Sequence, residues 1–529
     1  MATARSAACS RRSRSARAKE RAIRLLRRFA LVAVCAAALS GAAAPGAGAA
    51  SLTRHQQAVL YGIARATWRF YAADVDPATH LPLDNLGPGD VRGQYTSAAN
   101  VGVYLWAVVA ADDLGLIDRS RARSLITATL DEVLTLKRYD GFLYQWYDTN
   151  NGNVLLNPGA GDCTETTPSQ DNCWFVSAVD NGWYASGLIE VREALPELRG
   201  LADQLLEPMN FAIFYDDRAQ TACNTNASLP GDPPTGQMYG GYYVDQGPAG
   251  YHNGALYSDP RIAIYIGIGK RQMPGDVWWR TWRTLPPQRC PTDPDFSWQG
   301  QWPVAGYWRT YTDPQSGKQF NVWEGHYTYP GTSLTFVPTW AGGMFEGLMA
   351  NLVVPETTWG PHSFGLDDLR WAQVQAIYAT QVLHYPVWGM SPSSTPDDSG
   401  NYAADGVDGL AFGPEQQLSQ SVCSPDCETA VTPHASFIAL PVIPQQAYAN
   451  IEALLAGYPG IYSPDGGFYD AVDPTTGSIG HRRLVLDQSM IMAGIDDALR
   501  DGALQRRFAS DPLSWAARLY LGYETMSIG

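Results

Sequence analysis

Six segments of the chain are apolar on nearly every side and rich in glycine and alanine. A helix without a polar face has to be buried all round, so these segments predict inner helices. Five of them begin with Ser or Thr, the residues that often cap a helix N-terminus. The six segments are 97–111, 177–191, 258–270, 339–354, 432–442 and 484–499.

Amphipathic stretches lie between and after these segments and predict outer helices. They include 121–137, 198–211, 366–383, 444–455 and 513–523. No linker rich in Pro and Ser and no block of charge divides residues 51–529, which favours one domain. We therefore expect a single all-α domain, an (α/α)6 toroid barrel whose inner ring is wrapped by an outer ring, with long aromatic-rich loops.

The first 50 residues have the pattern of an export signal. A basic stretch over 11–28 leads into the short apolar run 29–39 and then a small-residue tract that ends near Ala50. This order is typical of a secretory signal peptide. Arg27 and Arg28 directly before the apolar run are compatible with a twin-arginine route. We expect a secreted or periplasmic protein, with the catalytic domain over residues 51–529.

The net charge of the chain limits the classes of partner that we expect. Residues 51–529 carry 27 basic against 51 acidic side chains, a formal charge of −24. Binding to nucleic acid or to anionic lipid depends on basic patches, so neither partner is expected. No later segment reaches the roughly 18 consecutive apolar residues of a membrane helix, so we expect no membrane insertion. We also expect a monomer.

Six cysteines follow the signal segment, an even number that indicates disulfides in an oxidising compartment. The shortest loops join Cys163 to Cys173, Cys223 to Cys290 and Cys423 to Cys427, although six cysteines allow 15 pairings. The six cysteines form no C-x-x-C pair and the chain has no H-x-x-x-H pair, so no metal site is expected. No cofactor is expected either.

One ionisable side chain stands near the start of five predicted inner helices. A carboxylate in a first turn often only caps the helix, and that reading stays open for each acid alone. Glu346 is the sharpest case, because its segment has no polar face and it is expected beyond the capping position. If the starts share one end of the barrel, these groups meet in one cavity. The five are Asp180, Asp259, Glu346, His434 and Asp487.

Aromatic residues crowd the predicted loops on the same rim. Tyr and Trp offer flat apolar faces with a polar tip, which suits the C–H faces and hydroxyl edges of sugars, although aromatics also simply pack loops. An acidic cavity with such a rim predicts an oligo- or polysaccharide substrate. The loop aromatics are Tyr144, Trp146, Tyr147, Tyr239, Tyr242, Tyr243, Tyr251, Trp302, Tyr307, Trp308, Trp323, Tyr327, Tyr329 and Trp388.

Two carboxyl groups across a glycosidic bond are the usual hydrolytic apparatus, and Asp259 with Glu346 on successive inner segments is the predicted pair. The supporting or substrate-binding residues expected beside them are Asp180, Glu324, Asp405, Asp487, His434, Trp146 and Trp388. His434 is also explained as a core histidine, and Glu324 and Asp405 as solvated loop acids.

At these residues the chain resembles the glycoamylase-like family, which includes bacterial β-1,2-glucanases and the transglycosylase domain of cyclic β-1,2-glucan synthases. Ordered blocks over about residues 55–500 carry the resemblance. They include TSAANVGVYLWAVVAADDLGLI (96–117), FVSAVDNGW (175–183), LYSDPRIAIYIGIGKRQMP (256–274), WAGGMFEGLM (340–349), PVWGMS (386–391), VTPHASFIALPV (431–442), GGFYDAVD (466–473) and LDQSM (486–490).

The resemblance implies an (α/α)6 barrel that acts on β-glucans without a metal. It implies a general acid at Asp259, a base or nucleophile at Glu346 and a supporting acid at Asp180. Asp259, Pro392 and Asp470 each stand where the family pattern commonly has Glu.

The sequence therefore predicts an exported glycoside hydrolase on a β-linked glucan or related bacterial glycan. Two alternatives stay open: a transglycosylase on the same glycan, and a glycan-binding protein that has lost its acid function. A lyase or epimerase on a uronate is disfavoured, because an anionic substrate needs a basic cleft.

Overall fold

The inner helices form where the sequence has no polar face, as predicted. A computed structural model of the chain describes residues 51–529 apart from 90, 170–172, 218–235, 285–303 and 408–429. It is mostly helical. The inner helices are α3 (Ala98–Asp113), α5 (Ala178–Ala194), α7 (Arg261–Gly269), α10 (Met344–Leu348), α14 (Pro433–Ile438) and α16 (Val485–Leu499).

Each inner helix contacts the next one along the chain, and the last contacts the first. The helix α3 packs on α5, α5 on α7, α10 on α14, α14 on α16, and α16 on α3. Between α7 and α10 the contact is a hydrogen bond from Arg261 Nη1 to the Glu346 carbonyl, at 3.1 Å. Six inner helices therefore follow one another in a closed order.

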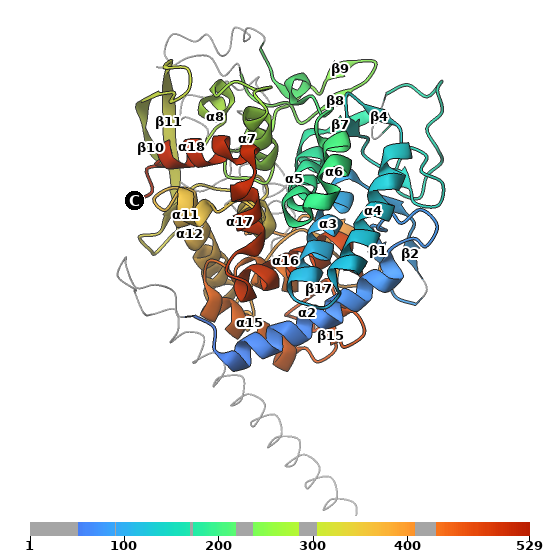
Figure 1. Cartoon of the computed structure of the whole chain (residues 1–529). Coiled ribbons are helices and arrows are strands. Elements are labelled where there is room, and N and C mark those ends of the chain that lie inside the picture. Colours follow the sequence, from blue (N-terminus) through green and yellow to red (C-terminus); the bar gives the residue numbers. More distant parts are fainter. Residues whose placement is uncertain (1–50, 90, 170–172, 218–235, 285–303, 408–429) are drawn as a thin grey trace, which may run out of the picture.

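Each inner helix also packs against one amphipathic partner. The pairs are α3 with α4 (Arg119–Thr135), α5 with α6 (Arg199–Leu206), α7 with α18 (Trp515–Tyr523), α10 with α12 (Phe364–Ile377), α14 with α15 (Pro444–Gly457) and α16 with α2 (Arg54–Asp74). Five of these partners overlap the predicted outer segments, and α2 is an additional one. In Figure 1, α2 runs along the lower edge of the molecule beneath α16 and α3.

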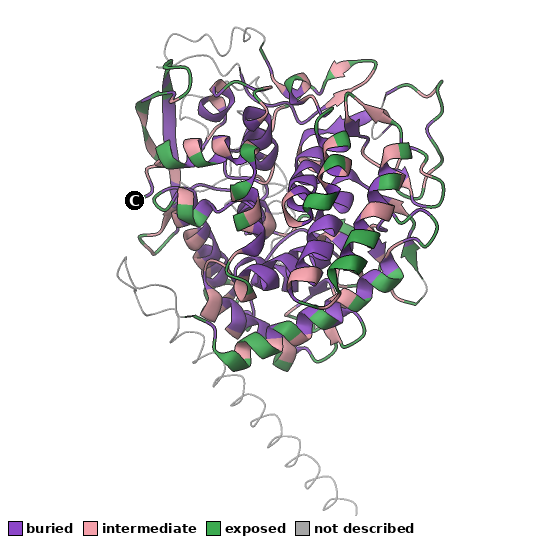
Figure 2. Ribbon diagram, viewed as in Figure 1, coloured by how far each residue is buried: buried purple, intermediate pink, exposed green. Residues whose placement is uncertain are grey.

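Burial separates the two sets. Every residue of α3 from Ala98 to Ala111 is buried, whereas α2 and α4 expose one side. Figure 2 shows this as purple inner ribbons behind green-striped outer ones. The apolar surface of the inner helices is the main driving force for this arrangement, because its removal from water is favourable on all sides.

Glycine allows two inner helices to approach closely. A Cβ on Gly102 of α3 would lie 2.4 Å from the Trp183 carbonyl oxygen of α5, and one on Gly187 would lie 2.3 Å from the Gly102 carbonyl oxygen. No other residue fits at either position without moving backbone. The glycine content of these segments therefore has a packing reason.

The expected Ser and Thr caps are only partly correct. Ser97 Oγ accepts a hydrogen bond from the Asn100 N–H at 3.1 Å, and Ser177 Oγ accepts one from Asp180 at 3.3 Å. The helix α7 instead begins after Pro260 and α10 after Gly343, so Ser258 and Thr339 do not cap them. Thr432 stands at the capping position of α14 without a side-chain bond to it.

The remaining helices are short. They are α8 (Asp276–Arg280), α11 (Glu356–Trp359) and α17 (Ala503–Ser510), the 3-10 turns η1 (Pro196–Leu198), η2 (Phe211–Phe214), η3 (Ala350–Leu352) and η5 (Pro512–Ser514), and the π-helix η4 (Tyr378–Val382). The predicted segment 339–354 is divided into α10 and η3, and the predicted segment 366–383 into α12 and η4.

The prediction of an all-α domain misses a β-hairpin. Strands β10 (Val304–Thr312) and β11 (Gln319–Thr328) pair antiparallel with Trp308 opposite Trp323, at the left edge of Figure 1, and β12 (Thr335–Phe336) extends them. Of the aromatics expected in loops here, Tyr307, Trp308, Trp323 and Tyr327 lie on strands, where flat rings pack well against cross-strand neighbours, Tyr329 lies in a loop, and Trp302 lies outside the described residues.

The other strands are short ladders in the loops. They are β1 (Asn85–Leu86), β2 (Arg92–Gly93), β3 (Tyr95–Thr96), β4 (Arg138–Tyr139), β5 (Phe142–Leu143), β6 (Tyr147–Asp148), β7 (Phe175–Ser177), β8 (Gly241–Tyr243), β9 (Gly247–Pro248), β13 (Ser393–Ser394), β14 (Tyr402–Ala403), β15 (Tyr462–Ser463), β16 (Gly467–Phe468), β17 (Ala471–Val472), β18 (Ile479–Gly480) and β19 (Arg483–Leu484).

The structure confirms one predicted disulfide, Cys163–Cys173, with 5.9 Å between the Cα atoms. The cysteines Cys223, Cys290, Cys423 and Cys427 lie outside the described residues, as does the predicted signal segment 1–50. Within the described part of the chain, none of the helices has the length and apolar character needed to cross a membrane.

Candidate active site

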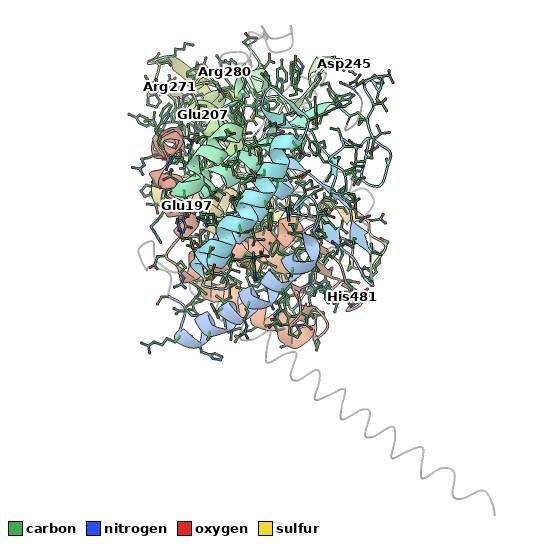
Figure 3. The ribbon with its side chains drawn as sticks, turned by 45° about the vertical axis from the view of Figure 1, so that its right-hand side comes forward. Glu197, Glu207, Asp245, Arg271, Arg280 and His481 are labelled. Atoms are coloured by element: carbon green, nitrogen blue, oxygen red, sulfur yellow. A yellow bond between two sulfur atoms is a disulfide. The ribbon has the colours of Figure 1, made fainter. Side chains whose placement is uncertain are left out.

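The starts of the inner helices lie at one end of the molecule. Gly182 near the start of α5 approaches Ala263 of α7, and Phe345 of α10 lies 6.3 Å from His434 of α14, ring centre to ring centre. In Figure 3, Asp245 and His481, from loops that precede α7 and α16, lie toward the right edge. Glu197 and Arg271, which follow the ends of α5 and α7, lie toward the left edge.

Asp259 lies just before α7, at the wall of a cavity of about 390 Å³. Its carboxyl group is half-buried and accepts hydrogen bonds from the side chains of Trp183 and Ser258, the second at 3.3 Å. Burial raises the pKa of Asp259 to about 6 in spite of these bonds and of the nearby Arg261. The cavity is also lined by Val179, Tyr251, His252, Asn253, Ala255, Ser258, Pro260 and Trp340.

Glu346 is buried in the first turn of α10, with 6% of the residue exposed. Its Oε2 accepts hydrogen bonds from the N–H groups of Ala341, at 2.9 Å, and Gly343, at 3.1 Å. Glu346 lies past the N-cap residue Gly343, as predicted, but its carboxyl also caps the helix by accepting from the Gly343 N–H. Capping and a second role are compatible, since both bonds use a single oxygen.

The two carboxyl groups interact electrostatically. Burial and the negative charge of Asp259 raise the pKa of Glu346 to about 8. Two acids whose pKa values are separated in this way hold one proton between them around neutral pH, which is the arrangement that general acid–base chemistry requires. In the empty site the higher value places that proton on Glu346.

Arg261 connects the elements that carry the pair. Its guanidinium forms a buried bidentate ion pair with Glu356, with both N–O distances 2.8 Å, and donates to the carbonyls of Glu346 and Gly347. Tyr265 also donates to Glu356, at 2.7 Å. Because Arg261 stands two residues after Asp259, one side chain fixes α7 against α10. Sequence reasoning missed it; the signal was an arginine inside an otherwise apolar segment.

A second group of acids lies at the starts of α14 and α16. His434 Nδ1 is 3.1 Å from Asp487 Oδ2, and both residues are buried. Burial raises the pKa of Asp487 to about 7 and lowers that of His434 to about 4, so the histidine is neutral at neutral pH. Burial and the charge of Asp487 raise the pKa of Asp470 well above its ordinary value.

Asp84 belongs to the same group and was not predicted. It accepts hydrogen bonds from Asn85, at 2.8 Å, and from Asn100 at the start of α3, at 2.9 Å. Its carboxyl interacts with Asp470 and has a pKa raised by burial. It lies in an ordinary loop sequence, so no pattern distinguishes it.

One segment of chain connects the two acid groups. At its first end, the Met344 N–H of α10 donates to the Met390 carbonyl at 2.9 Å. At its other end, Ser394 donates to Asp470 Oδ2 through both its N–H and its hydroxyl, each at 2.7 Å. Tyr402 pairs with Ser394 across β13–β14, and its hydroxyl pKa is raised by burial and by the charges of Asp487 and Asp470.

Two other predicted residues, Asp180 and Trp146, lie around these groups. Asp180 accepts from Gln145 Nε2 at 3.3 Å and adjoins Val179 of the cavity wall, while burial raises its carboxyl pKa. Trp146 packs edge-on against Tyr95, 5.4 Å between ring centres. Tyr95 is itself bonded to Asn85 beside Asp84, at 3.0 Å.

The loop acids and Trp388 are placed differently. Burial raises the pKa of Asp405 to about 7, and its loop reaches α10 through a bond from the Val407 N–H to the Gly342 carbonyl at 3.0 Å. Trp388 is buried, with its backbone held on both sides by the Asn450 amide.

Glu324 lies in a separate cluster. It is fully buried on β11, and burial with the charge of Glu524 raises its carboxyl pKa to about 7, opposed by Arg283. Arg283 and Glu524 form a buried ion pair. The expectation of a solvated loop acid is therefore wrong for Glu324, since it stands on a buried strand position.

Among the described residues, no group of three or more His, Cys, Asp or Glu side chains is arranged to hold a metal ion.

Comparison with known proteins agrees with this architecture. Residues 333–512 match the Glycoamylase family model, described as "Putative glucoamylase", and residues 62–231 match DUF3131, a family of unknown function. An endo-β-1,2-glucanase from Chitinophaga pinensis, solved with sophorotriose and glucose, superposes with a TM-score of 0.61 at 15% identity, over 89% of this chain and 98% of that one. A β-1,2-glucanase from Parabacteroides distasonis gives 0.61 at 14% identity, over 89% and 60%.

A shorter match concerns a curated protein. The cyclic β-(1,2)-glucan synthase NdvB of Rhizobium meliloti (strain 1021) is 33% identical over 132 residues, which is 24% of this chain and 4% of that protein. The chain thus spans a small part of this relative. The family match over 333–512 covers about a third of the chain and contains Glu346 and both ends of the connecting segment, and the solved glucanases share the fold.

Proposed function

We propose that the protein is an exported glycoside hydrolase that cleaves a β-linked glucan with the carboxyl pair Asp259 and Glu346. The observation that carries this proposal is the placement of the two acids: Asp259 lines a cavity just before α7, and its charge raises the proton affinity of Glu346 at the start of α10. Such pairs place one acid and one base across a glycosidic bond.

We infer that the scaffold is an (α/α)6 barrel. The closed order of six inner helices, each with its amphipathic partner, supports this architecture. Its loops at the starts of the inner helices would form the sugar-binding face, because the starts carry both acid groups.

The resemblance assigns the general acid to Asp259 and the base or nucleophile to Glu346. The exposure of Asp259 toward the cavity supports that assignment, since the acid must reach the glycosidic oxygen. The pKa order of the empty site supports the reverse, with the proton on Glu346. Activity on an aryl glycoside distinguishes these two assignments, because the aryl leaving group needs little protonation.

Asp259→Asn should retain most of its activity on an aryl β-glucoside while losing at least about a hundredfold on the natural glycan, consistent with the usual contribution of a general acid. Glu346→Gln should lose both activities. The opposite pattern would exchange the two roles, and equal retention of both activities in both variants would refute the carboxyl pair.

The substrate class is tested with a panel of β-linked glucans and arabinan-type glycans, with the product anomer followed by NMR. The names of the neighbours place β-1,2-glucan first in the panel. Supplying a free glucoside acceptor distinguishes transfer from hydrolysis by the appearance of longer products. Binding without turnover in the wild-type protein would mean a glycan-binding protein, and silence across the panel would reject both.

Export is part of the proposal. The basic and apolar pattern of residues 1–50 supports it, as does the Cys163–Cys173 disulfide, which is characteristic of an oxidising compartment.

A further inference from the structure

One aromatic side chain of the cavity is both exposed and held in place. Tyr251 lines the same cavity as Asp259, and 41% of the residue remains exposed. A large aromatic residue that stays exposed at a concave site has surface available for a ligand. Its neighbours in the lining, Val179 and Trp340, add further apolar surface.

The Tyr251 ring lies directly over a glycine. A Cβ on Gly240 would fall 1.9 Å from Cε2 of the ring, so only glycine leaves room for it. The Gly240 N–H also donates to the Tyr251 carbonyl at 3.0 Å. Backbone and ring are thus both in contact with Gly240, which limits the positions that the ring can take.

The next residue anchors the loop. His252 Nε2 lies 2.9 Å from Asp216 Oδ2, and its ring stacks on Tyr239 with 4.9 Å between centres and 19° between planes. A ring that is held before the ligand arrives loses little conformational freedom on binding, which increases affinity.

Sugar rings are the class of ligand that fits a fixed tyrosine face. Their axial C–H groups pack on an aromatic plane, and their hydroxyls bond to polar groups at its edge. Asp180 adjoins Val179, which lines the same cavity as Tyr251, so a carboxyl group lies near this wall of the cavity.

We propose that Tyr251 is a sugar-stacking residue that holds one glucosyl unit of the β-linked glucan against Asp259, and that Gly240 is required to position it. This inference rests on the proposed function. It assigns Tyr251 to substrate binding and Gly240 to positioning, with no part in proton transfer.

The first test uses β-1,2-, β-1,3- and β-1,4-linked glucotrioses with the full chain. For the trisaccharide that wild type cleaves best, Tyr251→Ala should raise KM about tenfold and change kcat less than threefold, while Tyr251→Phe should stay within about threefold of wild type in KM. Tyr523→Ala is the matched control, because that tyrosine is 53% exposed on the outer helix α18.

The second test leaves the tyrosine in place. Gly240→Ala should raise KM as much as Tyr251→Ala, because the added methyl displaces the ring. Gly250→Ala is its control, since that glycine is the residue before Tyr251 and a Cβ there meets nothing within 4 Å. The pH profile of kcat/KM should be the same in all five variants, as none removes a proton-transfer group.

The outcomes separate the two proposals. Cleavage by wild type together with an unchanged KM in Tyr251→Ala would overturn the stacking role and leave the proposed function standing. Binding of a glucotriose without cleavage, measured by calorimetry and weakened about tenfold in Tyr251→Ala, would support the stacking role and overturn the enzyme. Absence of both binding and cleavage with all three would overturn both.

Discussion

At the scale of single residues, the site is built from carboxyl groups that the fold keeps away from water. Burial raises the pKa of Glu346, and burial and Asp487 raise that of Asp470. Each of these carboxyl groups ionises more readily in water than inside the folded protein, so burying it costs folding free energy. Residues with pKa values shifted in this way are concentrated at functional sites.

The raised pKa of Glu346 makes stability depend on pH. Its folded value, about 8, lies above its ordinary value, so the folded state binds more protons than the unfolded state between the two. The free energy of unfolding should therefore fall as pH rises from about 5 to about 8, by at most about 1.4 kcal/mol per pH unit for one group. Below the ordinary value the contribution is fully present.

Urea unfolding of wild type and Glu346→Gln at several pH values measures this effect. The variant should show a flatter dependence over that range, whereas Glu165→Gln, an exposed loop position, should keep the wild-type slope. A Glu346→Gln profile parallel to that of wild type would contradict the buried, protonated carboxyl.

At the scale of secondary-structure elements, Arg261 joins α7 to α11 through its ion pair with Glu356 and to α10 through its bonds to the carbonyls of Glu346 and Gly347. Removing one partner of a fully buried ion pair leaves an uncompensated charge, which typically costs about 3–5 kcal/mol.

Arg261→Met should lower the free energy of unfolding by about that amount and lower kcat as well, because α10 carries Glu346. The double variant Arg261→Met/Glu356→Leu should recover most of the stability, since no charge remains unpaired. Thermal unfolding monitored by circular dichroism measures both. A double variant as unstable as the single one would show that the pair is not the source of the loss.

The α3–α5 contact gives a second prediction at this scale. Gly102→Ala should destabilise the protein by more than about 1–3 kcal/mol, because the methyl meets the backbone of α5 in a tightly packed core. Gly62→Ala on α2 is the matched control: this glycine is half-buried, a Cβ there meets nothing within 4 Å, and alanine should stabilise the helix by about 0.5–1 kcal/mol. Similar effects at both positions would argue against the close approach.

At the scale of the whole molecule, export and the Cys163–Cys173 bond should go together. The chain expressed with residues 1–50 should be recovered outside the cytoplasm with this disulfide formed, as measured by mass spectrometry of non-reduced peptides. The chain without residues 1–50 should stay in the cytoplasm with both thiols reduced.

The double variant Cys163→Ser/Cys173→Ser should lose about 2–3 kcal/mol of stability, the loop-closure estimate for a short loop. Recovery of the full chain in the cytoplasm with free thiols would contradict the export proposal.

Much of this architecture could be predicted from local sequence patterns. The six apolar segments are inner helices because a helix without a polar face is stable only when surrounded, and that property is visible in residues 97–111 or 484–499 without any neighbour. The hairpin β10–β11 was not foreseen, since its aromatic residues suit loops and strands equally and its pairing partner is what decides.

What the sequence alone determined is therefore which segments are buried helices and that acids such as Asp259, Glu346 and Asp487 stand near their starts, because periodicity and residue type are local properties. Only the tertiary structure decided which acids meet. It joined Asp84 and Asp470 to Asp487, placed Glu324 with Arg283 and Glu524, and set Arg261 between α7 and α10, because pairing between distant parts of a chain depends on how the helices pack.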